Sequence, residues 1–232
     1  FDGQTNQGDY DGFVTKYSTA GVKLWTKFIG GSGHDYIHSI ATDSSGNIFI
    51  GGSGGLYKLD ANGSILASAN AGEMRDMSIS GNYLYTRSTG YIGKFNTTDL
   101  SLVSSFNNNY YAGYDLYVDD NGYMYVDDYN NTANTIYKLD PNGNVVASSS
   151  SSMYVTNMFL KDGYLYVNNS FGQIQKLNTS DLSTVKVFDN VYYGGYLTVD
   201  NSGNIFTAGV SCEDQQNCST GNYVNFIMKV TQ

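Results

Sequence analysis

The chain has 232 residues, of which 41% are hydrophobic and 14% are charged, with 27 glycines, 22 tyrosines and one proline. This hydrophobic content excludes a wholly disordered chain, and no apolar run approaches the roughly 20 residues of a membrane-spanning helix. The net charge of −9 argues against nucleic-acid binding, which needs clustered lysine and arginine.

Short aromatic and aliphatic runs, separated by turn residues, follow one another along the whole chain without a helical period. A strand pair at residues 13–29 comes first and belongs to an incomplete terminal unit, 1–30. Complete units of four short strands, here called A to D in chain order, are predicted near residues 36–70, 74–106, 113–151 and 155–188. The last unit, near residues 192–231, contains A, B and C strands only.

Two anchors recur with this period. A glycine or asparagine precedes each predicted B strand, at intervals of 36, 40, 41 and 40 residues: Gly46, Asn82, Gly122, Gly163 and Gly203. A lysine lies inside each predicted C strand: Lys16, Lys58, Lys94, Lys138, Lys176 and Lys229. We expect each lysine stem to pack along its blade while the ammonium reaches solvent.

A meander of about 40 residues cannot bury both of its faces alone, so copies must stack. Radial stacking predicts an all-β fold, a single-domain β-propeller over residues 1–232 with four-stranded blades. A parallel β-helix is the rival, but its rungs are usually shorter and lack two-residue hairpin turns.

The terminal strands do not match. Strand types A, B and D occur five times each, whereas type C occurs six times, including residues 13–18 and 224–230. A five-bladed ring leaves one C strand over, and the alternative six-bladed ring lacks three strands. The extra strand either thickens the closing blade, belongs to a longer array, or completes a blade of another copy by strand addition.

One stretch resembles a known repeat. Residues 8–53, "GDYDGFVTKYSTAGVKLWTKFIGGSGHDYIHSIATDSSGNIFIGGS", resemble the bacterial SBBP-type β-propeller repeat in their two strands and their Asp-Ser-Ser-Gly-Asn turn. Middle units containing "GQIQKLN" and "NTIYKLDPNGN" are similar to NHL-type repeats of bacterial and archaeal propellers. The resemblance extends over essentially the whole chain. It implies a propeller and assigns no catalytic residue.

Recognisable catalytic motifs are missing from the sequence. The two histidines, His34 and His38, are four residues apart, and outside a helix we expect no one-faced pair from this spacing. No Ser-His-Asp set, zinc-protease motif or P-loop occurs. The carboxylate turns "VDDNGY" and "YVDDYNN" lack the spacing and the distal glutamate of a calcium loop. We therefore predict no enzyme and no cofactor, with calcium as the remaining alternative.

A candidate ligand site lies where the A strands begin, at the mouth of the predicted channel. Aligning the A strands on Ile40, Met77, Leu116, Met158 and Leu197 brings polar and aromatic residues to one level. The candidate ligand-binding residues are His38, Arg75, Asp76, Tyr114, Asp115, Asn157 and Tyr196. Such a ring could hold a sugar by stacking and hydrogen bonds, or an acidic group through Arg75 and His38. The alternative is a water-filled channel lined by polar groups.

The two cysteines point to an oxidising compartment. Cys212 and Cys218 bracket a short polar loop, which favours a local disulfide bond. Six glycosylation sequons are expected to carry glycans only if a glycosylating cell secretes the protein: Asn62, Asn96, Asn130, Asn168, Asn178 and Asn217.

The sequence thus predicts a non-catalytic extracellular or cell-surface module of structural or adhesive type. It would self-associate, through terminal strand exchange into a filament, or bind a glycan or a protein. A soluble sugar-binding lectin and a propeller enzyme of lyase or lactonase type, with its site at the channel mouth, are the alternatives.

Overall fold

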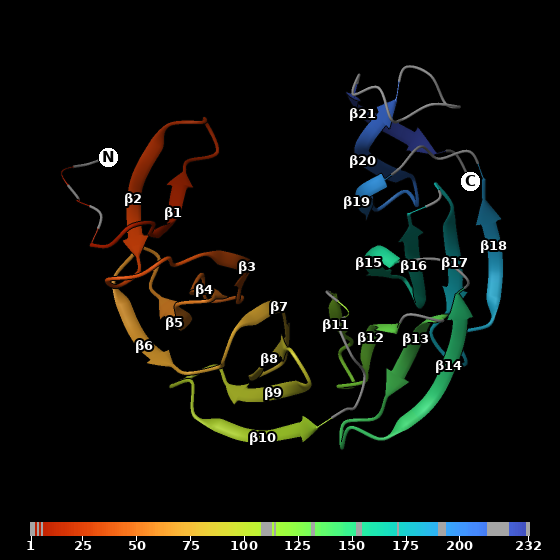
Figure 1. Cartoon of the computed structure of the whole chain (residues 1–232), viewed down its shortest axis with the longest axis horizontal. Helices are drawn as coiled ribbons and strands as arrows, with labels where there is room; N and C mark the ends of the chain where they lie inside the picture. Colours follow the sequence, from red (N-terminus) through yellow and green to blue (C-terminus); the bar gives the residue numbers. More distant parts are fainter. Residues whose placement is uncertain are drawn as a thin grey trace. The chain divides into compact units, whose positions relative to one another are not determined.

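The computed structural model describes residues 3, 5, 7–107, 113, 115–130, 133–151, 155–170, 172–189, 194–212 and 223–230. All regular elements in these residues are β-strands, each joined to its sheet neighbours in antiparallel fashion (Figure 1). Among the described residues, no helix is long and apolar enough to cross a membrane. The chain divides into two compact units, Phe1–Asn109 and Tyr110–Gln232.

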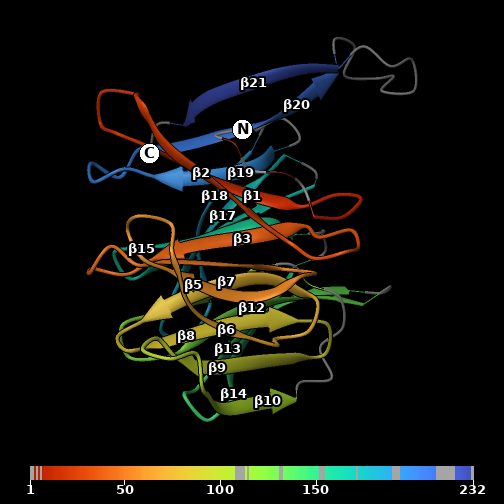
Figure 2. The same ribbon diagram turned by 90° about the vertical axis from the view of Figure 1, so that its left-hand side faces the viewer.

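The first unit contains a two-stranded sheet and two four-stranded sheets (Figure 2). The two-stranded sheet pairs β1 (Gly12–Tyr17) with β2 (Lys23–Ile29). The next sheet runs in the order β3 (Ile37–Thr42), β4 (Ile48–Gly52), β5 (Gly55–Leu59) and β6 (Ile65–Ala69). The third comprises β7 (Met74–Ser80), β8 (Tyr83–Ser88), β9 (Tyr91–Asn96) and β10 (Leu102–Asn107).

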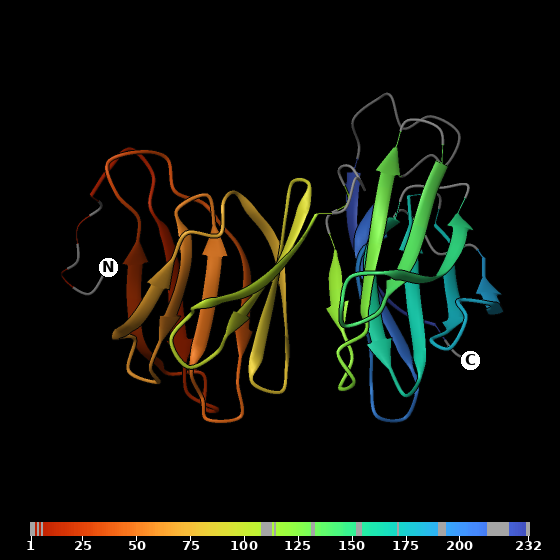
Figure 3. The same cartoon turned by 90° about the horizontal axis from the view of Figure 1, so that it is seen from below.

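The second unit contains two four-stranded sheets and a three-stranded sheet (Figure 3). The first comprises β11 (Leu116–Val118), β12 (Met124–Asn130), β13 (Ala133–Leu139) and β14 (Val145–Ser151). The second comprises β15 (Val155–Lys161), β16 (Tyr164–Asn169), β17 (Ile174–Asn178) and β18 (Thr184–Phe188). The last comprises β19 (Gly194–Val199), β20 (Ile205–Cys212) and β21 (Tyr223–Val230).

The predicted fold class, an all-β propeller of four-stranded blades with unmatched terminal strands, is confirmed. The 21 strands of the described residues correspond to five sets of four and one additional strand. Both terminal sheets contain a lysine-bearing C strand, β1 with Lys16 and β21 with Lys229. Within the described residues, the sheet of β1 contains no A or B strand and the sheet of β21 contains no D strand.

An aspartate-based turn recurs between strands and explains why the repeat is so regular. In the β13–β14 turn, Asp140 Oδ1 accepts hydrogen bonds from the backbone N–H groups of Asn142 and Asn144, both at 2.9 Å. Gly143 follows with a φ of 86°, a left-handed conformation that glycine adopts without steric penalty. The same arrangement occurs at Asp43, Asp60, Asp119 and Asp200.

These turns make the fold sensitive to acid. Hydrogen bonds from the Asn144 side chain and backbone hold the pKa of Asp140 below its ordinary value, and those from Asn204 do the same for the pKa of Asp200. A carboxylate whose pKa is lower in the folded than in the unfolded chain stabilises the fold above its unfolded pKa, and this stabilisation is lost as the pH falls through the folded pKa.

We therefore expect the free energy of unfolding to be level near neutral pH and to fall below about pH 4. Urea denaturation across a pH series measures this dependence. In an Asp140→Asn variant, the free energy of unfolding should decrease less at acidic pH, because one of the carboxylates that cause the decrease is absent. A stability that is unchanged or higher at acidic pH would contradict the role assigned to these turns.

Within each unit, adjacent blades pack through apolar residues of facing strands. Phe49 of β4 and Met77 of β7 belong to one buried cluster between their two blades. In the second unit, Tyr125 of β12 packs in a cluster with Met158 of β15, and Tyr166 of β16 packs with Leu197 of β19. At each of these three interfaces, the A-strand apolar residue and the B-strand aromatic residue of the preceding blade therefore belong to the same buried cluster.

The repeated lysines differ in part from the expectation that they extend into solvent. The ammonium of Lys94 lies 4.0 Å from the ring centroid of Tyr83, and that of Lys176 lies 4.0 Å from the ring centroid of Tyr164. Lys58 is buried, and its ammonium donates to the backbone carbonyl of Thr98 in the next blade at 3.1 Å. These lysines thus stabilise the blades through cation–π contacts and one inter-blade hydrogen bond.

Candidate functional site

A β-bulge interrupts the start of several A strands. The register shifts between Ile37 and Ser39 in β3 and between Met74 and Asp76 in β7. It shifts in the same way in the second unit, between Val155 and Asn157 in β15 and between Gly194 and Tyr196 in β19. A bulge leaves one residue without its ladder partner, so a backbone N–H near it needs another acceptor.

In the second unit, polar residues of the predicted ring supply that acceptor. Asp115 Oδ2 accepts a hydrogen bond from the Met158 N–H of the next blade at 2.7 Å. Asn157 Oδ1 accepts one from the Leu197 N–H of the blade after it at 2.9 Å. Asp115 is itself oriented by its own N–H, which donates to Asp127 Oδ1 at 3.0 Å. These side chains therefore join neighbouring A strands.

The first unit uses a variant of this arrangement. Ser39 Oγ donates to Asp76 Oδ1 at 2.9 Å, and the same oxygen accepts the Met77 N–H at 2.8 Å. The shorter serine side chain thus reaches the next blade through the carboxylate of Asp76. Arg75 beside it is partly buried, whereas His38 is exposed.

The structure places the predicted ligand residues in two groups. His38, Arg75 and Asp76 lie at the start of β3 and β7 in the first unit. In the second unit, Asp115 directly precedes β11, and Asn157 and Tyr196 lie near the starts of β15 and β19; Tyr196 is exposed. Tyr114 lies outside the described residues. A ligand at these residues stays a prediction, and oxygens of Asp76, Asp115 and Asn157 already accept backbone hydrogen bonds.

The expectation that His34 and His38 share no face was wrong. Residues two and four apart point to the same side of an extended chain, and His34, Tyr36 and His38 do so. Their ring centroids are 6.5 and 6.4 Å apart, and the planes of His34 and Tyr36 are inclined by 5°. Tyr10 stacks on His34 at 4.9 Å. Both histidines of the chain therefore belong to one exposed aromatic row.

The carboxylate turns considered for calcium serve the backbone. Asp119 Oδ1 accepts N–H groups of its own turn, and Asp119 Oδ2 accepts the Tyr125 hydroxyl at 3.3 Å. Burial, followed by the charge of Asp119, raises the pKa of Tyr125. Asp127 and Asp128 are buried. Within the described ranges, no group of three or more His, Cys, Asp or Glu residues could hold a metal ion.

The predicted disulfide bond and part of the predicted glycosylation sites involve residues that the structure does not describe. Cys218 and Asn217 lie in the undescribed range 213–222, as does the loop that the disulfide would close. Asn62 is exposed, whereas Asn168 is fully buried and its Nδ2 lies 3.5 Å from Thr207 Oγ1. The remaining sequons are the half-buried Asn96 and Asn178, and Asn130, whose side chain is outside the described part of the chain.

The apolar A-strand position on which the repeats align is exposed to solvent in β3. The alignment of the sequence alone does not reveal this exposure. Ile40 of β3 is 57% exposed. The equivalent residues Met77, Met158 and Leu197 are 6%, 0% and 6% exposed, and each lies in a buried cluster that includes an aromatic residue of the preceding blade. Among the residues that the structure describes, the β1–β2 sheet that precedes β3 contains no B strand to carry this aromatic residue.

The last sheet of the chain has the complementary feature. Phe206 of β20 occupies the B-strand position of Phe49, Tyr125 and Tyr166. Those three residues are buried, whereas Phe206 is partly exposed, and Ile227 of β21 is 84% exposed. The A-strand face of β3 that the first unit leaves uncovered is the leading face, and the face of the β19–β21 sheet that the second unit leaves uncovered is the trailing face. They are two candidate functional surfaces, one in each unit.

Comparisons with known proteins agree with this architecture. The family model described as "Beta-propeller repeat" (SBBP) matches residues 24–55, which confirms the predicted resemblance there. A crystal structure of a protein of unknown function from Bacteroides caccae is similar with a TM-score of 0.65 at 16% identity, covering 92% of this chain and 89% of that one. No curated protein matches the sequence.

Two further solved structures share the fold at low identity. The Neurospora crassa Pan2 WD40 domain has a TM-score of 0.68 at 12% identity, covering 84% of this chain and 66% of that one. The computationally designed Ika8 protein has a TM-score of 0.62 at 10% identity, covering 78% and 58%. The chain is therefore similar to SBBP β-propeller repeat proteins over residues 24–55 and to β-propellers in its fold.

Proposed function

We propose that this chain is a non-catalytic structural module of the cell surface or the extracellular space, and that its copies join head to tail through the leading and trailing faces. The observation that carries the proposal is that the sheets of the first unit leave Ile40 57% exposed, at a position that the other blade interfaces bury. Removing an isoleucine side chain from water contributes about 1.5–3 kcal/mol. An uncovered face of this kind favours association.

The blade contacts within the chain indicate which surface of a second copy would pack on the leading face. Aromatic residues of the B strands share a buried cluster with the A-strand apolar residue of the next blade at the three interfaces described above. Phe206 of a second copy is the matching residue for Ile40, because both occupy the corresponding positions of incomplete interfaces. The occupant we propose is therefore a second copy of this chain.

The sheet edges support the same arrangement. In the described part of the chain, β1 pairs only with β2, and β21 pairs only with β20. An edge strand offers a row of backbone donors and acceptors that another chain can pair with. Since the leading and trailing faces differ, their contact is heterologous and produces rings or filaments rather than a two-fold dimer.

Composition supports the location outside the cell. Only 14% of the residues are charged, and asparagine, serine, threonine, glycine and tyrosine supply most of the polar surface. The closely spaced Cys212 and Cys218 favour an oxidising compartment. The residues that recur in every repeat form turns, strands and the contacts between blades. This recurrence supports a structural role over a catalytic one.

Sedimentation and light scattering over a range of protein concentrations test the proposal, with electron microscopy of the native preparation. We expect particles that are multiples of 25.3 kDa, that grow with concentration and that appear as rings or filaments. A particle of 25.3 kDa at every concentration would mean that no second copy covers the leading face.

A further inference from the structure

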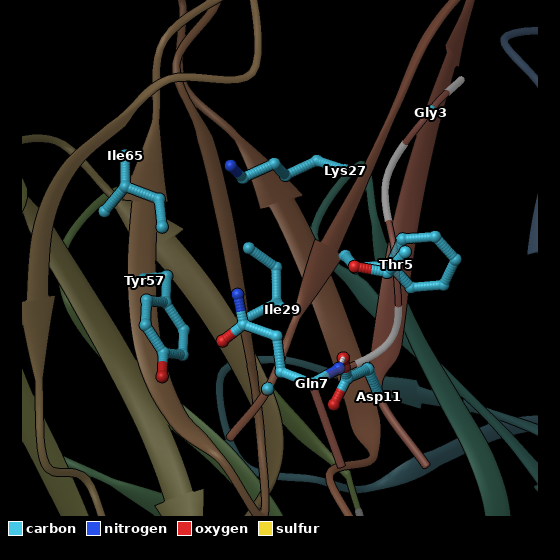
Figure 4. A pocket seen from close by; sticks show the side chains of 10 residues that line it. Gly3, Thr5, Gln7, Asp11, Lys27, Ile29, Tyr57 and Ile65 are labelled. Carbon is cyan, nitrogen blue, oxygen red and sulfur yellow. Dashed lines mark hydrogen bonds between the residues drawn. The ribbon is translucent and has the colours of Figure 1, made fainter. Parts of the chain in front are cut away.

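A cavity of about 400 Å³ lies in the first unit, away from the A strands. It is bordered by the end of β2, by Tyr57 of β5, by Ile65 of β6 and by described residues of the chain before β1, among them Gln7 and Asp11 (Figure 4). Its volume falls within the range of about 300–1,000 Å³ that small-molecule sites occupy.

The lining of this cavity has an apolar side and a polar side. Figure 4 shows Tyr57 and Ile65 on one side and Thr5 and Asp11 on the other, with the Lys27 side chain extending toward the space between them. The Tyr57 hydroxyl donates to the Gly54 carbonyl at 2.9 Å, which fixes the ring. An aromatic ring held in this way offers its face to an apolar group of a ligand.

Hydrogen-bonding groups remain available on the polar side. Lys27 is half-buried, and its ammonium has no hydrogen-bond or ion-pair partner among the described residues. Asp11 also lines the cavity, and its Oδ2 accepts the Gln7 N–H at 2.7 Å and can accept one more donor. Asp11 Oδ1 is buried away from solvent and is not offered to a ligand. A ligand that supplies both donors and acceptors would satisfy groups that the protein leaves open.

The cavity is lined by one positive charge, on Lys27, and one negative charge, on Asp11, and this combination indicates the class of ligand. A free carboxylate or phosphate would face Asp11, and a cationic ligand would face Lys27. A neutral polyhydroxylated ring can donate to the aspartate, accept from the lysine and place its C–H face on Tyr57. From this cavity we propose a binding site for a neutral monosaccharide unit, free or at the end of a glycan. The site does not depend on self-association.

Gly30 provides a sharp test of the site. A Cβ at this position would lie 2.3 Å from Asp11 Oδ1, so alanine must displace the carboxylate from the cavity wall. The neighbouring Gly31 has nothing within 4 Å of its Cβ position, and Gly31→Ala is the matched control. Lys27→Met keeps most of the side-chain volume while removing the ammonium donor.

Saturation-transfer NMR and calorimetry with glucose, galactose, mannose and N-acetylglucosamine measure the binding. We expect saturable binding of at least one of these sugars, weakened about tenfold or more by Lys27→Met and by Gly30→Ala, and unchanged by Gly31→Ala. Circular dichroism confirms that each variant is folded. No saturable binding by the folded protein, or binding that both Lys27→Met and Gly30→Ala leave intact, would overturn the proposal. Binding of a free amino acid instead of any sugar would overturn the ligand class.

Discussion

Replacing Asp115 by alanine should lower the free energy of unfolding by about 1.5–3 kcal/mol, the range measured for hydrogen bonds to charged groups. The Asp115 carboxylate accepts the backbone N–H of Met158 at 2.7 Å across two blades. Met158 is fully buried, so its N–H would be left without an acceptor in a place that water reaches poorly. Losing this hydrogen bond therefore also weakens the contact between the two blades that it joins.

Urea denaturation of Asp115→Ala beside Asp120→Ala measures this effect. Asp120 is exposed in the following turn, so its replacement removes the same charge without removing an inter-blade acceptor. Asp115→Asn, which keeps an oxygen acceptor, should retain most of the stability. Equal stability of the Asp115→Ala and Asp120→Ala variants would show that the inter-blade hydrogen bond contributes little.

Replacing Ile40 by aspartate is expected to abolish assembly. A carboxylate at this position would be buried without a partner when a second copy covers the leading face, and such burial costs several kcal/mol. A loss of about 3 kcal/mol corresponds to a decrease of more than a hundredfold in the association constant. The variant itself should fold normally, because Ile40 is already exposed to solvent in the first unit.

The control for this variant is Val103→Asp in β10. Val103 is 51% exposed on the outermost strand of a complete blade, so the substitution adds the same charge away from the proposed contact. Light scattering should show assembly of Val103→Asp and only 25.3 kDa particles of Ile40→Asp. If both variants assemble to the same extent, the leading face is not the contact between copies.

The repeat could be predicted from the sequence because its signals are local. The Asp-x-x-Gly turns depend on a side chain that accepts N–H groups two and four residues later, and on a glycine at positive φ. Strand alternation between these turns then sets which residues are buried. These two local signals were sufficient to predict the strands and the number of strands of each type.

Other features depend on contacts between blades and could not be predicted in this way. The A-strand bulges free backbone N–H groups, and only the neighbouring blade shows that Asp115 and Asn157 accept them. Leu182 adopts a φ of 60° in a turn that lacks glycine, which its buried side chain stabilises against the intrinsic preference. The exposure of Ile40 likewise follows from the absence of two strands in another sheet.

The shared side of His34 and His38, in contrast, could have been predicted from the sequence. The period-two rule for extended chain already places residues 34, 36 and 38 on one side, so His34 and His38 could have been paired from the sequence. The exposed residues continue to alternate through Ile40. Tyr36 is therefore a natural reporter for the leading face.

Hydroxyl-radical footprinting of Tyr36 at increasing protein concentration tests the central claim most directly. Tyr36 is exposed within the row beside the leading face, and Tyr83 of β8 is an internal reference on a complete blade. We predict that Tyr36 is modified in dilute protein and becomes protected as concentration rises, while Tyr83 does not change. Modification of Tyr36 that stays the same at every concentration would contradict the assembly of copies through this face.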